Sequence, residues 1–424
     1  MQIPYVTLLG KAVRKIALLR GGGSALPGLF IETIDPDFIK RTLDQLPQGI
    51  VIVSGTNGKT TTTKMTVELL ESQGLKVFTN RTGSNFTRGV AAALLGEVDK
   101  KGNLDADIAV LELDEAHAIQ FIKTIPPRYS LLLNVMRDQL DRFGEIDATA
   151  KLLTKIAVST TDTVILNRED PRIVGISSSL KDQKAVYFGL SPKLLTLFPN
   201  DDDIHGQPAT LAHSTLPAEV ILSDLNDDAA QFTIGDHTVT TTLELKGVYN
   251  VYNAAAALAL ARVVVGDTLD ETKLIDTLAH VTPAFGRGET LTIDGQPLEL
   301  VLVKNPSGFR LSLSSFKPAG YQTMIAINDN YADGRDMSWL WDVNFDTLQP
   351  GGVSTVSGLR AYDMALRLQY DEVATAHVDT DLAASLQYFI VNGAGLPKRI
   401  FCTYTAMLTL RRELAKITDV ETIS

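Results

Sequence analysis

The most informative stretch of this chain is Ser54-Gly55-Thr56-Asn57-Gly58-Lys59-Thr60-Thr61-Thr62-Thr63. An apolar run at residues 49–53 leads into it, and a pattern typical of a helix follows from Thr61 to Ser72. A strand, a glycine-rich turn and a helix in this order aim backbone N–H groups and a helix N-terminus at a phosphate. We therefore expect residues 55–61 to bind a nucleoside triphosphate. Lys59 would reach its terminal phosphates, and the Thr60 hydroxyl would coordinate Mg²⁺.

The spacing of the glycines departs from the usual phosphate loop. The usual pattern puts a glycine five residues before Gly58, where this chain has Val53, and its first glycine is instead Gly55. The loop is therefore a shortened variant. A glycine turn that carries only a solvated lysine is the alternative interpretation.

Composition limits the class of protein. A length of 424 residues predicts two or three domains, and 45% hydrophobic with 21% charged residues is typical of a globular protein. A net charge of -11 argues against a nucleic-acid partner. The single cysteine, Cys402, excludes a disulfide framework and a cysteine-based zinc site, so we expect no zinc. Because Cys402 lies in the apolar run 399–404, we expect a buried strand residue rather than a nucleophile.

The sequence also suggests where the protein acts. No stretch reaches the ~20 apolar residues that span a bilayer, and the N-terminus has no cleavage signal, so we expect a cytoplasmic protein. Residues 5–20 predict a helix in which Lys11, Arg14, Lys15 and Arg20 stand among apolar residues. Such a helix either packs on its own domain or lies on an anionic membrane surface.

Apolar strands at 75–78, 108–111, 130–134 and 163–167 alternate with helical patterns, which indicates a parallel doubly wound sheet. Glu112 ends the second of these strands, where a further Mg²⁺ contact belongs; Asp114 and Glu115 are either contacts or solvated acids. Asn85, in a polar turn after the strand at 75–78, is expected to face the same ligand. The strand at 163–167 ends in Asn167 and runs into Arg168-Glu169-Asp170-Pro171, and these residues are suited to hold the nucleoside.

The pattern changes twice along the chain. Short alternating runs between about 187 and 245 indicate a β insertion or extension, and a helix follows with Asn250 and Asn253 at its start, as N-terminal caps or nucleotide contacts. We place a helical lead-in at 1–47, the ATP-binding domain at 48–295 and a smaller α/β domain at 296–424.

Several stretches of the chain resemble the Mur ligase superfamily, which includes folylpolyglutamate synthase. They are Gly55–Thr61, Leu111-Glu112, Gly247-x-x-Asn250-x-x-Asn253-Ala254 and Gly286-Arg287. A more specific resemblance is to the MurT family, the synthetase subunits of lipid II isoglutaminyl synthase. It rests on Leu26-Pro27-Gly28, Gly83-Ser84-Asn85, Leu111–Glu115, Arg137–Asp147, Lys304-Asn305-Pro306 and Asp333-Gly334-Arg335-Asp336-x-Ser338-Trp339. These stretches are spread over nearly the whole chain.

The resemblance implies a fold and an activity. The fold would be a Mur ligase-type parallel-sheet ATP-binding domain with a small β insertion, followed by a smaller Rossmann-like domain. The activity would use ATP and Mg²⁺ to convert the α-carboxylate of D-glutamate in the lipid II stem peptide into an acyl phosphate. Ammonia from a GatD-like glutaminase would then displace phosphate and leave D-isoglutamine. This is a step of peptidoglycan biosynthesis at the inner face of the bacterial plasma membrane.

The resemblance also implies roles for individual residues. Lys59, and Mg²⁺ held by Thr60 and Glu112, would position and neutralise the phosphates. Asn250, Asn253 and Arg287 would join the nucleotide contacts. An acidic residue of the C-terminal domain would orient the histidine of the partner's Cys–His pair. That position matches Asp336, and spacing leaves Asp333 and Asp342 as alternatives.

The chain departs from the resemblance at several points. The four cysteines of a zinc ribbon that many MurT proteins carry are missing from 187–245. Lys151 and Lys155 lie near the place of the carbamylated lysine of Mur ligases, but we do not transfer that role. Gln139 stands where those ligases have a histidine, which leaves a second metal site open. The competing interpretations are an amide ligase that adds an amino acid to a carboxylate, and an ATP-binding scaffold without catalysis.

Overall fold

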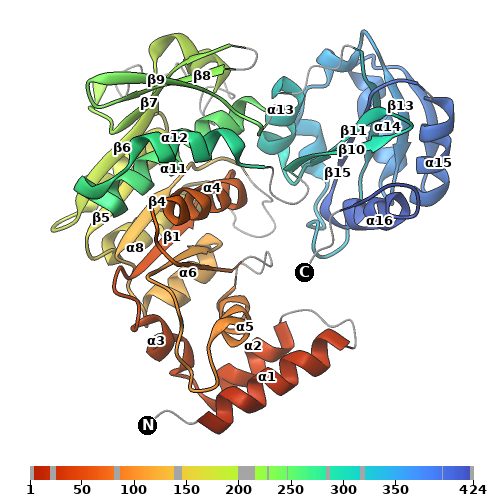
Figure 1. The fold of residues 1–424 in the computed structure, drawn as a ribbon. Coiled ribbons are helices and arrows are strands. Elements are labelled where there is room, and N and C mark those ends of the chain that lie inside the picture. Colours follow the sequence, from red (N-terminus) through yellow and green to blue (C-terminus); the bar gives the residue numbers. More distant parts are fainter. Residues whose placement is uncertain are drawn as a thin grey trace.

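The computed structural model describes residues 4–19, 25–80, 86–137, 146–198, 215–226, 229–245, 247–282, 287–315, 320–393 and 395–420. These residues form two α/β units on separate sheets, called here sheet A and sheet B (Figure 1). Three helices precede sheet A: α1 (Pro4–Leu19), α2 (Ala25–Ile34) and α3 (Phe38–Leu43). The helices α1 and α2 lie side by side at the end of the molecule away from sheet B (Figure 1).

Sheet A has nine strands in the order β2-β3-β1-β4-β5-β6-β7-β8-β9. Neighbours are parallel from β2 to β7, and β7, β8 and β9 pair antiparallel. The strands are β1 (Ile50–Ser54), β2 (Val77–Thr79), β3 (Ile108–Glu112), β4 (Tyr129–Leu132), β5 (Thr163–Asn167), β6 (Lys184–Leu190), β7 (Val220–Leu225), β8 (Ala229–Ile234) and β9 (His237–Thr242). The expected α/β fold with a parallel sheet is confirmed. The alternating runs between 187 and 245 extend this sheet, because β6 to β9 continue its strand order.

Helices cover both faces of sheet A. In β1, Val51 and Val53 belong to the core under α4, α11 and α12, whereas Ile50 and Ile52 belong to the core under α5, α6, α8 and α9. Successive side chains of a strand point to opposite faces, so a continuous apolar run needs a cover on each side. The helices are α4 (Lys59–Ser72), α5 (Thr87–Glu97), α6 (Glu115–Ile122), α8 (Ile146–Ser159), α9 (Pro171–Ile176), α11 (Val248–Val265) and α12 (Glu271–His280), with short 3₁₀ turns η1 (Ser177–Ser179), η2 (Pro192–Leu197) and η4 (Gly266–Thr268).

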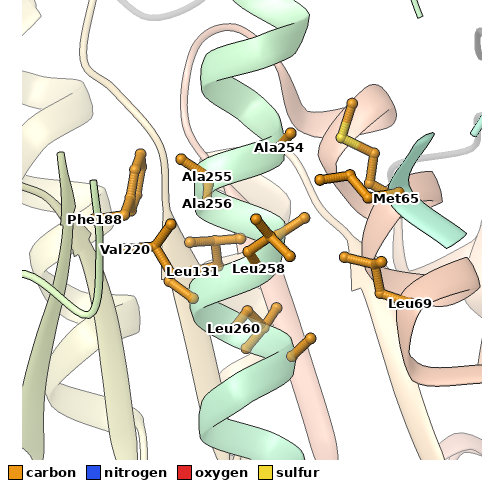
Figure 2. Close-up of a cluster of buried hydrophobic side chains, with 14 of the residues drawn as sticks. Met65, Leu69, Leu131, Phe188, Val220, Ala254, Ala255, Ala256, Leu258 and Leu260 are labelled. Atoms are coloured by element: carbon orange, nitrogen blue, oxygen red, sulfur yellow. The ribbon is translucent and has the colours of Figure 1, made fainter. Parts of the chain in front are cut away.

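The helix α11 is the centre of the core on one face of sheet A. Its residues Ala254–Ala261 are fully buried between sheet strands, which contribute Leu131, Phe188 and Val220, and α4, which contributes Met65 and Leu69 (Figure 2). A helix that is apolar all round is stable when it is covered all round. Small alanines let α11 approach both α4 and the sheet.

One helical stretch of the described residues, Val248–Thr268, is long and apolar enough to cross a membrane by length and composition alone. The expectation that no stretch meets this criterion was too strict. This stretch is mostly buried inside the protein, as the core helix of a globular unit is.

Sheet B has six strands in the order β10-β11-β15-β12-β13-β14, all parallel except the antiparallel pair β10–β11. The strands are β10 (Arg287–Ile293), β11 (Gln296–Leu302), β12 (Gln322–Ala326), β13 (Val353–Ser357), β14 (Thr375–Asp379) and β15 (Lys398–Cys402). The helices are α13 (Pro306–Ser315), η5 (Ser338–Asp342), η6 (Asp346–Leu348), α14 (Ala361–Tyr370), α15 (Leu382–Asn392) and α16 (Tyr404–Leu414). The boundary expected between 295 and 296 falls in the turn of the β10–β11 hairpin. The change of sheet comes earlier, between α12 and β10.

Candidate functional site

The phosphate loop connects β1 to α4, and two of its glycines adopt positive φ. Gly55 has φ +133° and Gly58, the residue before the first turn of α4, has φ +88°. Residues with a Cβ rarely adopt such angles. A Cβ at Gly58 would also lie 2.5 Å from Asn253 Oδ1 in α11. The loop thus presents bare backbone at a helix N-terminus, between α4 and α11, as a phosphate-binding turn requires.

Asn134, two residues beyond the buried end of β4, fixes the shape of this loop. Its Oδ1 accepts the backbone N–H of Asn57 at 2.9 Å, and its Nδ2 donates to the Asn57 carbonyl at 3.0 Å. The backbone N–H of Thr56 donates to the Asn134 carbonyl at 3.0 Å. The sequence reasoning missed Asn134 as a site residue. The rule that selected Glu112, a polar residue at the carboxyl end of a parallel strand, could have found it.

The structure brings Thr60 and Glu112 together, as the magnesium hypothesis requires. Thr60 Oγ1 donates to Glu112 Oε1 at 2.9 Å, and Glu112 is 5% exposed. The side chain of Asn80, at the end of β2, bonds both the backbone N–H and the carbonyl of Glu112, at 3.0 and 2.8 Å. Asn80 begins the polar turn expected to face the ligand, but it was not selected as a site residue, because the sequence does not reveal that its amide bonds the backbone of a residue on another strand.

Lys59 lies against two carboxylates. Its Nζ donates to the Gly55 carbonyl at 2.6 Å and lies 3.4 Å from both Asp114 Oδ1 and Glu115 Oε1. Glu115 is only 3% exposed. Glu115 is therefore not a solvated acid, whereas Asp114, whose side chain is 22% exposed, faces both Lys59 and solvent.

The residues that meet here fit Mg²⁺ with oxygen ligands. Among the described residues there is no cluster of three or more His, Cys, Asp or Glu side chains that could hold a metal ion. Mg²⁺ does not need one, because it is commonly held by one or two carboxylates together with substrate phosphates. The partly buried Thr60 and the buried Glu112, beside the helix N-terminus, supply a hydroxyl and a carboxylate of that kind.

A cavity lies between the unit built on sheet A and the unit built on sheet B, and it opens beside the phosphate loop. Its lining comes from the phosphate loop and α4, the strand ends of sheet A, α11, β11 and α13. It includes Asn57, Gly58, Thr61, Asn134, Asn167, Asp170, Tyr249, Asn250, Tyr252, Asn253, Leu302, Gly308, Leu311 and Ser312. The predicted contacts Asn167, Asn250 and Asn253 thus all border one cavity. The α11 asparagines are not N-terminal caps, since α11 begins at Val248 after Gly247, which has φ +102°.

Asn167 and Asp170 shape the wall of this cavity. Asn167 Oδ1 accepts from the Tyr252 hydroxyl at 2.5 Å and from Glu169 N at 2.9 Å, while Nδ2 donates to the Leu133 carbonyl. Asp170, in the stretch expected to hold the nucleoside, accepts three backbone N–H groups, including that of Val135 at 2.6 Å. Burial raises the pKa of Asp170 to about 6.

The phosphate loop also contacts the second unit. Asn57 Nδ2 donates to Ser307 Oγ at 2.9 Å, and Asn305 Nδ2 donates to Asn57 Oδ1 at 3.3 Å. Ser307 Oγ donates to the carbonyl of Arg137, 3.2 Å away on the β4 side. The start of α13 is therefore attached to the loop by side-chain hydrogen bonds.

The acidic loop of the second unit contains three candidates, which differ in exposure. Asp333 is 4% exposed and accepts from Thr405 N, Thr405 Oγ1 and Asn330 N, at 2.7, 2.5 and 3.1 Å; burial raises its pKa. Asp336 is partly exposed, and hydrogen bonding from Ser338 lowers its pKa. Asp342 is exposed. Asp333 anchors its own loop, which leaves Asp336 and Asp342 accessible.

Most of the other residues named from the sequence lie in the described part of the chain, and two do not. Cys402 is fully buried in β15, as expected, and burial raises the pKa of its thiol well above the usual value. Lys151 and Lys155 lie on α8. Arg287 begins β10, with its backbone paired to Val301. Asn85 and Gln139 lie outside the described residues.

Comparison with known proteins gives a consistent result. The family model of the Mur ligase middle domain matches residues 53–261, and that of the MurT ligase C-terminal domain matches residues 302–407. The chain is 30% identical to the lipid II isoglutaminyl synthase (glutamine-hydrolyzing) subunit MurT of Streptococcus pneumoniae, over 96% of each protein.

Two solved structures are similar in fold. A pseudomurein peptide ligase type C from Methanothermus fervidus superposes with a TM-score of 0.68 at 19% identity, covering 90% of this chain and 81% of that one. The MurF ligase from Thermotoga maritima in complex with ADP superposes with a TM-score of 0.66 at 17% identity, covering 91% and 84%. At such identities the likeness concerns the fold alone.

Proposed function

The chain belongs to the MurT family, and on that premise we propose that it is the synthetase subunit of a lipid II isoglutaminyl synthase. It is an ATP-dependent ligase that amidates lipid II to its isoglutamine form. The observation that carries this proposal is the hydrogen bond of Thr60 to the buried Glu112, beside Lys59, at the phosphate loop that borders the cavity between the two units. A site of this kind suits phosphoryl transfer from ATP.

The reaction has two balanced steps. An oxygen of the D-glutamate α-carboxylate attacks the γ-phosphorus of ATP, the bond from that phosphorus to the bridging oxygen breaks, and ADP leaves. Ammonia then forms a C–N bond at the carbonyl carbon of the acyl phosphate. The C–O bond to phosphate breaks, and one proton is lost. Activation is needed because a carboxylate is a poor electrophile and offers no good leaving group.

The protein's own residues position the nucleotide and neutralise its charge. The backbone of residues 55–61 and the N-terminus of α4 bind the phosphates, and Lys59 moves from its carboxylate partners to them. Asn85, Asn167, Asn250, Asn253 and Arg287 contact the rest of the nucleotide. Mg²⁺, held by Thr60 and Glu112, supplies further charge neutralisation when bound. Lys59, Glu112 and Thr60 form the catalytic core of this proposal.

A second protein supplies the ammonia, and we infer that it is a GatD-like glutaminase. The only cysteine of this chain is Cys402, and a buried thiol with a raised pKa is unsuited to hydrolyse glutamine. Asp336 is accessible and remains ionised, so it suits the role of orienting a partner's histidine better than the loop anchor Asp333.

The second unit also exposes an aromatic surface near this loop, called here the α14 surface. It consists of Trp341, Leu359, Tyr362, Leu366 and Tyr370. Exposed aromatic residues are enriched at protein interfaces. The α14 surface therefore suits the glutaminase. The lipid II substrate implies that the protein works in the cytoplasm at the inner face of the plasma membrane.

The decisive experiment measures amidation of lipid II with ATP, using either ammonium chloride or glutamine with a co-purified glutaminase as the nitrogen source. We expect Lys59→Ala to abolish both activities. Asp336→Asn should retain the ammonium-dependent activity and lose the glutamine-dependent one. Addition of a free amino acid to a lipid II precursor instead would overturn the proposal in favour of an amide ligase of the Mur type.

A further inference from the structure

The first two helices form the outermost layer of the molecule on one side. Small residues let both helices pack closely against α5. A Cβ at Gly28 of α2 would lie 2.0 Å from the Arg88 carbonyl of α5, and a Cβ at Gly10 of α1 would meet Leu95 of α5 at 2.8 Å. Thr7, Gly10, Gly28 and Ile31 are buried. Since helix residues three or four apart share a face, the opposite faces of α1 and α2 point to solvent.

The solvent-facing sides of these helices are apolar. Leu9 and Ala12 on α1, and Leu26 and Leu29 on α2, are exposed, with Leu26 at 61% and Leu9 at 54%. Lys15, also exposed, lies on the same face of α1. We call these five residues the N-terminal face. Exposed aliphatic residues gathered on adjacent helices mark a surface that binds something apolar.

Charge distinguishes this layer from the rest of the protein. The first 34 residues contain Lys11, Arg14, Lys15 and Arg20 but only one acidic residue, Glu32, in a chain that has 39 basic and 50 acidic residues. The carboxylate of Glu32 is itself 3.4 Å from Arg88 Nε. A local positive charge on an acidic protein complements an anionic surface. An apolar face flanked by Lys and Arg is the pattern of helices that lie in a membrane interface.

We propose that the N-terminal face docks on an anionic phospholipid bilayer, with its leucines at the headgroup boundary and Lys15 on the lipid phosphates. Lys11, which donates to the Val98 carbonyl, and Arg14, which lies beside Gly96, add positive charge behind this face. The proposal rests on the proposed function in one respect: a lipid-linked substrate stays in the bilayer, so docking there brings the phosphate loop and the stem peptide onto the same surface. Peripheral docking of this kind raises the encounter rate without a membrane-spanning segment.

The test is flotation of the full-length protein with vesicles of phosphatidylglycerol and phosphatidylcholine in equal parts, or of phosphatidylcholine alone. We expect binding to the anionic vesicles that weakens at high salt, and little binding to the neutral ones. The variant Leu26→Glu/Leu29→Glu should bind the anionic vesicles at least roughly tenfold more weakly than the wild type, because two leucine contacts are lost. Val391→Glu/Ile417→Glu, which adds the same charge at exposed positions of the second unit, should bind as the wild type does.

Amidation of lipid II in detergent micelles serves as the separate reference. The Leu26→Glu/Leu29→Glu variant should retain that activity and a normal unfolding transition, while losing activity on lipid II embedded in vesicles. The proposal is overturned if the wild type does not float, floats equally with neutral vesicles, or loses binding equally in both double variants. Because the micelle assay does not depend on docking, its failure in the wild type would count against the proposed function alone.

Discussion

At the residue scale, Asn134 is the side chain whose removal should be most informative. Asn134→Ala deletes both hydrogen bonds to the Asn57 backbone and leaves the phosphate loop free to relax. At about 1 kcal/mol for each bond, kcat/KM for ATP should fall by about thirtyfold. The assay is ammonium-dependent amidation of lipid II at varied ATP.

Two further variants make this prediction specific. Asn134→Asp keeps the acceptor for Asn57 N but loses the donor to the Asn57 carbonyl, so its activity should lie between those of Asn134→Ala and the wild type. Asn392→Ala removes an exposed amide that only bonds its own helix and should have no effect. Equal activity of Asn134→Ala and the wild type would mean that the loop holds its shape without this amide.

The residues of the site differ in how far the sequence could reveal them. Thr60 and Glu112 were predictable, because their distance follows from two facts: a phosphate loop begins a helix, and parallel strands end at one edge. Asn80 was not predictable, since its role depends on the register between β2 and β3. The choice among Asp333, Asp336 and Asp342 required burial, which spacing within one loop does not encode.

At the element scale, the start of α13 is joined to the phosphate loop through Asn57 and Ser307. If this contact sets the loop's position during catalysis, the effects of Asn57→Ala and Ser307→Ala on kcat/KM for ATP should not be additive. Each should lower kcat/KM for ATP, and the double variant should lose little more than the worse single variant. The coupling free energy should be about 1 kcal/mol, as expected for side chains in direct contact.

The control for this cycle lies on the same helix. Ser314 bonds only carbonyls of α13, so Ser314→Ala should leave kcat/KM unchanged and its effect should add to that of Asn57→Ala. Strict additivity between Asn57→Ala and Ser307→Ala would contradict the coupling.

The helix α11 is buried in the core on one face of sheet A, so its packing should contribute to the stability of the first unit. Leu258 is fully buried between sheet A and α4 (Figure 2). Leu258→Ala should lower the free energy of unfolding by about 2–5 kcal/mol, because it removes buried methyl groups and leaves a cavity. Leu396→Ala, at a residue that is 51% exposed, should change it by less than about 0.5 kcal/mol. Urea titration followed by circular dichroism measures both; a small effect of Leu258→Ala would mean that the core closes around the gap.

At the scale of the whole molecule, the sequence predicted two α/β units but not how they meet. Alternating strands and helices identified each sheet, whereas the expected boundary between 295 and 296 falls in the turn of the hairpin β10–β11, beside the positive-φ residues Asp294 and Gly295. The contact of Asn57 with Asn305 and Ser307 joins residues about 250 positions apart, and no local pattern encodes such a pairing. The cavity that combines both units is likewise a property of the assembled chain.

Binding of the glutaminase and amidation itself should depend on different parts of this molecule. Tyr362 and Tyr370 lie two helical turns apart on α14, are 68% and 69% exposed, and Tyr370 packs edge-to-face against Trp341 at 5.0 Å. Tyr362→Glu/Tyr370→Glu places two charges where we expect a desolvated interface, so co-purification with the glutaminase and glutamine-dependent amidation should both fall by more than tenfold. Ammonium-dependent amidation should stay at the wild-type level, because α14 does not line the cavity.

Loss of both activities would place the defect in folding rather than in docking, which the unfolding transition would reveal. Retention of the complex and of both activities would show that the glutaminase binds elsewhere.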